Sequence, residues 1–394
     1  MAESTHDDGG LDPNPPRMDP MTRMAPSSPG SGDDCLVVGG GLIGMLTARE
    51  LALEGWRVRI LERGEAGAES SWAGGGILSP LYPWRAPEPV TRLALWSQRH
   101  YHALAEQLRA ESGIDPEWYH TGMLLLDSGE GSRARYWARD HGLRLELPDA
   151  ERVAQLEPAL GMTPSDAVWM PEVANIRNPR LVRALRGSLD HLGVPLHEQT
   201  PVTGWLKSEG RIEGVETESG RFEAGCVILA GGAWSGNLLA GTGVSADIRP
   251  VRGQMVVFRT TPGRVRRVLL RHDHYIIPRR DGHILAGSTL EEAGFDKTTT
   301  EEAKRQLVRL AISMVPALGN APVERHWAGL RPGSPQGVPL IGPHPELEGL
   351  WLNTGHYRNG VVMGPASARL LTDLLMGWPT RLDPSVYAPA PAEV

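Results

Sequence analysis

The chain has 394 residues, of which 40% are hydrophobic and 22% are charged, a composition typical of a globular protein with two or three domains. Its 40 lysines and arginines are outnumbered by 47 acidic residues, giving a net charge of −7. This charge argues against nucleic acid as a partner, because a phosphate backbone requires a basic surface. The two cysteines, Cys35 and Cys226, are too few for a disulfide framework or a cysteine-rich metal site. We therefore expect no metal and a reducing, cytoplasmic location.

Residues 1–32 form a low-complexity segment that is rich in proline and glycine and has almost no periodic apolar positions. We predict that they are a disordered leader. The beginning of the chain lacks the charged, apolar and small-residue pattern of a signal peptide. No apolar run reaches the ~20 residues that a membrane span requires, so we expect no membrane partner.

A strand–turn–helix–strand unit is predicted directly after this leader. The apolar run CLVV at 35–38 is typical of a strand that is buried on both faces of a parallel sheet. A helix is predicted over 42–54, with its charged residues on one side, and Gly55 is expected to end it. The second strand is predicted over 57–61. Such a unit is the framework of a dinucleotide-binding fold.

Three glycines with GxGxxG spacing, Gly39, Gly41 and Gly44, lie between the first strand and the helix. They allow a tight turn, the close approach of a pyrophosphate and the close packing of the helix, whose N-terminus faces the phosphate charge. Glu62 ends the second strand, where its carboxylate is placed to accept hydrogen bonds from the adenosine ribose. A carboxylate at this position would repel the 2′-phosphate of NADP. We therefore predict dinucleotide binding.

The later elements are predicted from periodicity, capping residues and turn residues. In chain order they are a helix over 91–110, a mixed and loop-rich region over 115–175, a helix starting at 179 with Asn178 as N-cap and Gly193 as its stop, an antiparallel meander over 200–230 ending in a buried strand at 227–230, strands over 255–259, 275–278 and 283–285, a helix over 301–314 with Thr299 and Glu302 as a capping box, a strand over 350–353, and a final helix over 361–376.

Three further glycine-rich stretches, at 70–78, 230–235 and 355–360, indicate which dinucleotide binds. The first could wrap the pyrophosphate, the second ends a buried strand where open α/β sheets bind ligands, and the third precedes the last helix. The N-terminus of that helix could stabilise negative charge on a reduced flavin. Because the stretches are spread over about 300 residues and no second GxGxxG unit is present, an extended cofactor such as FAD is favoured over NAD.

Four motifs give the chain a resemblance to a known family. They are SSWAGGGILSPLYPW at 70–84, WAGLRP at 327–332, PLIGP at 339–343 and GHYRNG at 355–360. The sequence resembles the FAD-dependent amino-acid oxidases of the D-amino-acid oxidase type over 34–378, and within them the bacterial glycine oxidases of thiamine biosynthesis.

The resemblance implies an α/β fold like that of p-hydroxybenzoate hydroxylase, in which a Rossmann-type FAD-binding domain carries an inserted mixed-sheet α+β substrate domain. The expected boundaries are 33–92, 175–248 and 325–378 for the discontinuous FAD-binding domain, 93–174 and 249–324 for the substrate domain, and 379–394 for a C-terminal tail.

The resemblance also implies roles for individual residues. Val202 is expected to contact the adenine through its backbone, and residues 75–78 to lie along the isoalloxazine. Arg358 corresponds to the arginine that fixes the substrate carboxylate, with Arg331 and Tyr275 as further pocket residues. This assignment is chemically sound, because a planar guanidinium binds a carboxylate bidentately and a tyrosine hydroxyl adds a donor. The histidines 272, 274 and 356 invite a general-base role, which we do not favour, because hydride can leave a neutral amine without a protein base.

Together, the fingerprint, the glycine-rich stretches and the resemblance define the expected cofactor site, and the FAD is expected to be non-covalent because no cysteine occupies an attachment position. A histidyl link is left open. The expected cofactor-binding residues are Gly39, Gly41, Leu42, Ile43, Gly44, Glu62, Arg63, Ser70, Ser71, Gly75, Gly76, Ile77, Leu78, Val202, Ala230, Gly231, Trp234, Gly355, His356, Arg358, Asn359, Gly360 and Val361.

The expected function is that of a flavoprotein oxidase acting on glycine or a small amino acid such as sarcosine or D-alanine. Hydride passes from the α-carbon to FAD and then to oxygen, giving the imino acid or glyoxylate, ammonia and hydrogen peroxide, with a role in thiamine thiazole synthesis. The alternatives are a quinone-linked D-amino-acid dehydrogenase, an oxidase of N-methylated amino acids, and a non-catalytic flavin-binding subunit of a larger complex. A tRNA-modifying flavoprotein would need a basic groove. The sequence leaves open whether the chain forms a homo-oligomer.

Overall fold

The computed structural model describes residues 34–244 and 246–391. The predicted leader at 1–32 lies outside the described residues. A six-stranded sheet forms the first layer, in the order β17-β18-β11-β1-β2-β7. Neighbouring strands are parallel except for β17, which is antiparallel to β18. Its strands are β1 (Cys35–Val38), β2 (Val58–Leu61), β7 (Leu196–His197), β11 (Val227–Leu229), β17 (Leu340–Pro343) and β18 (Leu350–Thr354).

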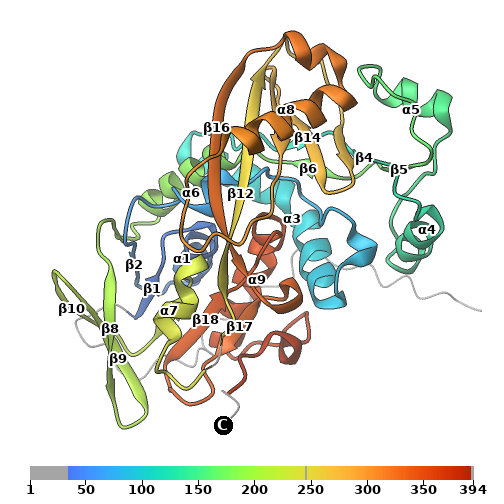
Figure 1. The fold of residues 1–394 in the computed structure, drawn as a ribbon. Helices are drawn as coiled ribbons and strands as arrows, with labels where there is room; N and C mark the ends of the chain where they lie inside the picture. The colour runs from blue at the N-terminus through green and yellow to red at the C-terminus, as the bar shows by residue number, and fades with distance from the viewer. Residues whose placement is uncertain (1–33, 245, 392–394) are drawn as a thin grey trace, which may run out of the picture. The chain divides into compact units, whose positions relative to one another are not determined.

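Both faces of this sheet are covered, which is why its strands are continuously apolar. Side chains on one face join a hydrophobic core with four helices, and those on the other face pack against a small antiparallel sheet. The helices are α1 (Leu42–Leu53), α3 (Glu88–Ser112), α6 (Asn178–His191) and α9 (Gly360–Leu375). The small sheet consists of β8 (Val202–Ser208), β9 (Arg211–Thr217) and β10 (Gly220–Glu223) (Figure 1).

A seven-stranded mixed sheet forms the second layer, in the order β16-β12-β15-β14-β13-β4-β5. Only β13 and β4 are parallel to each other. Its strands are β4 (Met123–Leu126), β5 (Ala167–Met170), β12 (Arg249–Arg259), β13 (Val268–Arg271), β14 (His274–Pro278), β15 (His283–Gly287) and β16 (Val323–Gly333). The long strands β12 and β16 run side by side over most of their length (Figure 1).

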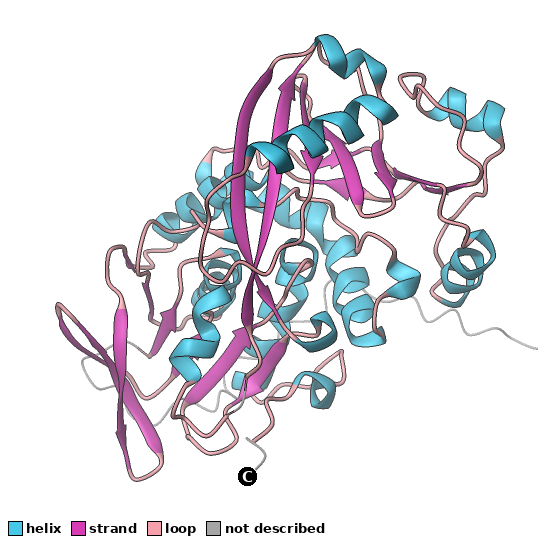
Figure 2. Cartoon of the chain, viewed as in Figure 1, coloured by secondary structure: helices cyan, strands magenta, loops and turns pink. Residues whose placement is uncertain are grey.

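The two faces of the seven-stranded sheet have different neighbours. One face packs against α5 (Ala150–Leu156) and α8 (Glu301–Met314), and α8 lies across the strands in Figure 2. The other face carries Tyr275 and Ile277 and packs against α4 (Gly131–Asp140) and the chain around Tyr82. The remaining α-helices and β-strands of the described residues are the short helices α2 (Ser70–Ala73) and α7 (Ser235–Leu239) and the two-residue strands β3 (Tyr119–His120) and β6 (Ala174–Asn175), which pair with each other.

The predicted fold class is confirmed: a Rossmann-type sheet is combined with a second, mixed α+β layer. The domain boundaries stay a prediction, and two elements bear on them. Strand β16, at the start of the segment 325–378, is hydrogen-bonded to β12 of the seven-stranded sheet. Helix α3, in the segment 93–174, packs into the core of the six-stranded sheet.

Two helix caps differ from their predictions by one residue. Arg177 is the N-cap of α6, so Asn178 is already helical, and its side-chain amide donates to the carbonyl of Ser71 at 2.8 Å. The side chain of Asn178, which local spacing predicted to cap the helix, instead binds a residue 107 positions away in the sequence. At α8, the hydroxyl of Thr300 rather than Thr299 accepts from the N–H of Ala303.

None of the helices in the described ranges is long and apolar enough to cross a lipid bilayer. Cys35 and Cys226 are both buried.

Candidate functional site

A cavity lies where the carboxyl ends of the parallel strands meet the Tyr275-bearing face of the seven-stranded sheet. Val38, Leu61, Ala230 and Thr354 line it from strand ends of the first sheet. Open α/β sheets bind ligands at this edge. Most of the predicted site residues line this cavity: Gly39, Gly41, Leu42, Ile43, Glu62, Arg63, Ser70, Ser71, Gly75, Gly76, Ile77, Val202, Ala230, Gly231, Trp234, Tyr275, Arg331, Gly355, His356, Arg358, Asn359, Gly360 and Val361.

Two predicted cofactor residues do not line the cavity. A Cβ at Gly44 would overlap with the carbonyl of Gly39, so this glycine acts by letting α1 pack closely on the turn, as its place in the fingerprint predicts. Leu78 is 1% exposed. Its N–H donates to the carbonyl of Ala174 at 2.9 Å and its carbonyl accepts from Gln98 at 2.7 Å, so both backbone groups are used inside the protein. Its role in binding the cofactor stays a prediction.

The turn after β1 requires glycine at its first position. Gly39 has a φ of +115°, and a Cβ there would meet the carbonyl oxygen of Ala230. The N-terminus of α1 follows, where the hydroxyl of Ser71 accepts from the N–H of Leu42 at 2.8 Å. The stretch at 70–78 is therefore fixed to the first turn of the helix that is predicted to face the pyrophosphate.

Glu62 lines the cavity but is only 9% exposed. One carboxylate oxygen accepts from the N–H of Gly40 at 2.7 Å and the other from the N–H of Gly64 at 2.9 Å. A carboxylate oxygen has more than one lone-pair site, so each retains capacity for a ribose hydroxyl. Next to it, the guanidinium of Arg63 lies 3.5 Å from the ring centroid of Trp234, and both residues form part of the wall.

The other end of the cavity carries two guanidinium groups and a phenol. Arg331, on β16, donates to the hydroxyl of Ser288 at 2.8 Å and to the carbonyl of Thr289 at 3.2 Å. Burial and the positive charge of Arg358 lower the pKa of Arg331, and the Tyr275 hydroxyl opposes this shift. Among residues 34–244 and 246–391, neither Arg331 nor Arg358 forms an ion pair with a carboxylate, and Arg358 has no side-chain hydrogen bond.

The cavity histidine is unsuited to take up a proton. His356 is 1% exposed, and its Nε2 lies 2.9 Å from the hydroxyl of Ser367. Burial lowers the pKa of His356 to about 3, so the ring is neutral at physiological pH. Burial also lowers the pKa of His274, which faces the charge of Arg358. In the part of the chain that the structure describes, no group of three or more His, Cys, Asp or Glu side chains could hold a metal ion.

Sequence reasoning missed several residues of the wall. Gly253 and Met255 come from β12 and Ser288 follows β15, while Gly329 lies on β16 two positions before Arg331. The WAGLRP motif contained a signal for Gly329, but nothing local marks the other three. They reach the cavity because β12, β15 and β16 are neighbours in the sheet, although the segments lie far apart in the sequence.

The chain is similar over most of its length to known proteins. A glycine oxidase of Pseudomonas aeruginosa is 52% identical over 356 residues, covering 90% of this chain and 98% of that protein. A bifunctional protein ThiO/ThiG of Synechocystis sp. is 32% identical over 369 residues, covering 91% of this chain and 53% of that protein. The crystal structure of glycine oxidase from Geobacillus kaustophilus superposes with a TM-score of 0.86 at 30% identity, covering 90% of this chain and 98% of that one.

The family model described as FAD dependent oxidoreductase matches residues 34–374. This match spans both sheets and the whole cavity, from the turn after β1 to the first turns of α9. The chain belongs to the DAO family of FAD-dependent oxidoreductases.

Proposed function

We propose that this protein is an amino-acid oxidase that takes glycine, or a small amino acid such as sarcosine or D-alanine, and uses oxygen as the electron acceptor. One observation carries the proposal. Arg331 and Arg358 bring two positive charges to one cavity, and neither forms an ion pair with a carboxylate of the described residues. An unneutralised pair of guanidinium groups in a partly desolvated site favours an anionic ligand, and the similarity to glycine oxidases favours a small amino-acid carboxylate.

The residues present fit FAD. Glycines on three separate loops leave bare main chain along the wall: Gly39 and Gly41, Gly75 and Gly76, and Gly355 and Gly360. Helices α1 and α9 both begin at the cavity, and their N-terminal N–H groups suit the pyrophosphate and the electron-rich edge of a reduced ring. When bound, FAD supplies a two-electron acceptor next to the amino acid.

The chain's own residues bind and orient the substrate. We propose that Arg331 and Tyr275 hold the carboxylate, with Arg358 as the second cation. This differs from the sequence-based preference for Arg358, because Ser288 and Thr289 already fix Arg331 and a fixed donor loses less entropy on binding. If the amine enters neutral, loss of hydride from the α-carbon and of one N–H proton gives the imine. Water then hydrolyses the imine to glyoxylate and ammonia, and oxygen takes up two electrons and two protons to give hydrogen peroxide.

The first experiment is a visible spectrum of the purified protein before and after glycine is added without air. We expect a bound flavin spectrum that glycine bleaches, followed by hydrogen peroxide formation when air is admitted. A colourless protein that FAD does not reconstitute would refute the proposal. A flavin that glycine reduces but oxygen reoxidises only slowly would favour the quinone-linked dehydrogenase. Preferred reduction by the tertiary amine dimethylglycine would favour an oxidase of N-methylated amino acids.

The second experiment tests the carboxylate-binding role with Arg331→Met. Removing one partner of a hydrogen-bonded charge pair costs about 2–5 kcal/mol, so we expect the dissociation constant for glycine to rise at least about thirtyfold. Arg325→Met is the matched control, because Arg325 lies on the same strand, is exposed and does not line the cavity. An unchanged constant in Arg331→Met would contradict the role.

The cellular setting is part of the proposal too. A role in thiamine thiazole synthesis is supported by the resemblance noted from the motifs and by the similarity to the protein named ThiO/ThiG. The small number of cysteines, two in 394 residues and both buried, supports a reducing compartment.

A further inference from the structure

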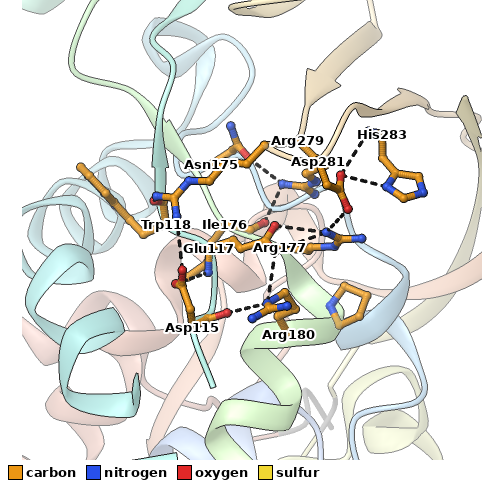
Figure 3. Close-up of polar contacts among 12 residues, drawn as sticks. Asp115, Glu117, Trp118, Asn175, Ile176, Arg177, Arg180, Arg279, Asp281 and His283 are labelled. Carbon is orange, nitrogen blue, oxygen red and sulfur yellow. Dashed lines mark hydrogen bonds and ion pairs between the residues drawn. The ribbon is translucent and has the colours of Figure 1, made fainter. Parts of the chain in front are cut away.

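A buried arginine, Arg279, connects the seven-stranded sheet to the wall of the cofactor cavity. It directly follows β14 and is 4% exposed. Its Nη1 donates to the side-chain oxygen of Asn175 at 2.5 Å and to the carbonyl of Ile176 at 3.0 Å, and its Nη2 donates to the carbonyl of Gly75 at 2.8 Å. Figure 3 shows the contacts of Arg279 with Asn175 and Ile176 as dashed lines. Gly75 itself lines the cavity.

The charge of Arg279 has no direct counter-ion within residues 34–244 and 246–391. The nearby carboxylates are bound by Arg177 instead, which lies 2.7 Å from Asp281 and 3.2 Å from Glu117 (Figure 3). Burial and the charge of Arg177 lower the pKa of Arg279 to about 10. Arg279 therefore remains a cation at neutral pH, and the oxygen atoms to which it donates are all neutral.

The contact with Gly75 fixes the orientation of one peptide group. In a planar trans peptide, the carbonyl and the following N–H point in opposite directions. Because the Gly75 carbonyl points to Arg279, the N–H of Gly76 points away from Arg279. Gly76 also lines the cavity, and its N–H has no acceptor in the part of the chain that the structure describes. The same peptide thus binds the arginine on one side and offers a free donor on the other.

The loop cannot easily adopt another shape. Gly76 has a φ of +73°, and a Cβ there would overlap with the carbonyl of Ile176. The N–H of Ile176 donates to the Gly76 carbonyl at 2.8 Å. Arg279 adds a second connection, because its guanidinium binds the carbonyls of both Ile176 and Gly75. The alternation of side chains along β14 puts Tyr275 and Ile277 on one face and, continued by one residue, Arg279 on the same face. Tyr275 and Ile277 lie next to Gly75.

We propose that Arg279 is a positioning residue for the cofactor. It holds the Gly75–Gly76 peptide so that the N–H of Gly76 is presented to the flavin, and it places a positive charge without a direct counter-ion behind that peptide. A fixed positive charge stabilises the more negative, reduced form of a nearby flavin, so Arg279 also raises the reduction potential. The inference concerns how the chain holds FAD and does not depend on which amino acid is the substrate.

The experiment compares three variants with the wild-type holoenzyme, using FAD titration of the apoprotein and the midpoint potential of the FAD-saturated protein. Arg279→Met removes both the hydrogen bonds and the charge of the guanidinium. We therefore expect FAD to bind at least about tenfold more weakly, which is equivalent to about 1.4 kcal/mol, and the reduction potential to fall. Arg279→Lys keeps the charge but cannot bind all three oxygens, so the potential should return toward the wild-type value while FAD affinity recovers only in part.

Asn175→Asp separates the positioning role of Arg279 from its effect on the reduction potential. It also keeps the proposal testable if Arg279→Met does not fold. The new carboxylate keeps a partner for Arg279 but neutralises its charge, so we expect a lower potential with FAD affinity within about threefold of the wild type.

Arg267→Met is the control, because Arg267 also donates to two carbonyls, of Leu156 and Thr121, but does not line the cavity. It should change neither quantity. A wild-type FAD affinity in Arg279→Met, or an unchanged potential in both Arg279→Met and Asn175→Asp, would overturn the proposal. Both measurements need no amino acid, so failure of glycine as a substrate would leave them interpretable.

Discussion

Adding one methyl group at position 253 should weaken binding of the substrate carboxylate and leave FAD binding unchanged. Gly253 lies on β12, opposite Gly329 of β16. A Cβ built at Gly253 would overlap with Nη1, Nη2 and Cζ of Arg331, each about 1 Å closer than ordinary van der Waals contact allows. Because the guanidinium is the movable end of a flexible side chain, Gly253→Ala should displace it rather than the β12–β16 pairing.

The size of the effect follows from what holds the guanidinium. Arg331 donates to Ser288 at 2.8 Å and to Thr289 at 3.2 Å, and a shift of about 1 Å takes a hydrogen bond beyond its working range. A hydrogen bond to a charged group contributes about 1.5–3 kcal/mol. Losing one such bond, either to Ser288 or to the substrate carboxylate, should therefore lower kcat/KM for glycine by about ten- to 150-fold.

The assay is anaerobic stopped-flow reduction of the bound flavin over a range of glycine concentrations. We expect the dissociation constant for glycine to rise in Gly253→Ala while the FAD content and the melting temperature stay close to the wild-type values. Gly319→Ala is the matched control, because a Cβ there meets no atom closer than 3.9 Å and the residue does not line the cavity. If Gly253→Ala binds FAD normally and has an unchanged glycine constant, Arg331 does not hold the substrate carboxylate.

Three further outcomes are expected. Burial lowers the pKa of His356 from 6.5 to about 3, so between these pH values only the unfolded chain takes up the proton. Stability should therefore fall as the pH drops, by up to about 1.4 kcal/mol per pH unit, and urea unfolding of His356→Asn should show a shallower pH dependence; equal slopes would contradict this. Glu62→Gln replaces an acceptor that faces two N–H groups with a partial donor, so we expect about tenfold weaker FAD binding by apoprotein titration and an unchanged glycine constant at saturating FAD. Gly44→Ala forces α1 away from the Gly39 carbonyl, and calorimetry of the apoprotein should detect a loss of about 1–3 kcal/mol; an undisturbed melting temperature would show that the helix can shift at no cost.

Local sequence predicted the elements that hold the nucleotide end of the cavity, because their signals are short-range. The GxGxxG spacing, the apolar strand before it and the acid after it lie within about 30 residues, and the structure has β1, α1 and β2 where they were predicted. Val202 was assigned by resemblance alone and also lines the cavity. The same local reasoning missed helices α4 and α5 in the region 115–175, whose short and strongly polar sequences carry few periodic apolar positions.

The sequence by itself thus determined that the chain is a dinucleotide-binding α/β protein with glycine-rich loops and two arginines suited to an anion. Only the tertiary structure decided how those groups are held. The contact between Arg279 and Gly75 joins residues 204 positions apart, and Gly253 reaches Arg331 across two paired strands. Such contacts depend on strand order and register in a mixed sheet, which are set by the burial of whole faces rather than by local spacing. That is why the glycine-rich loops could be predicted from their sequence pattern, whereas the contact of Arg279 with Gly75 could not.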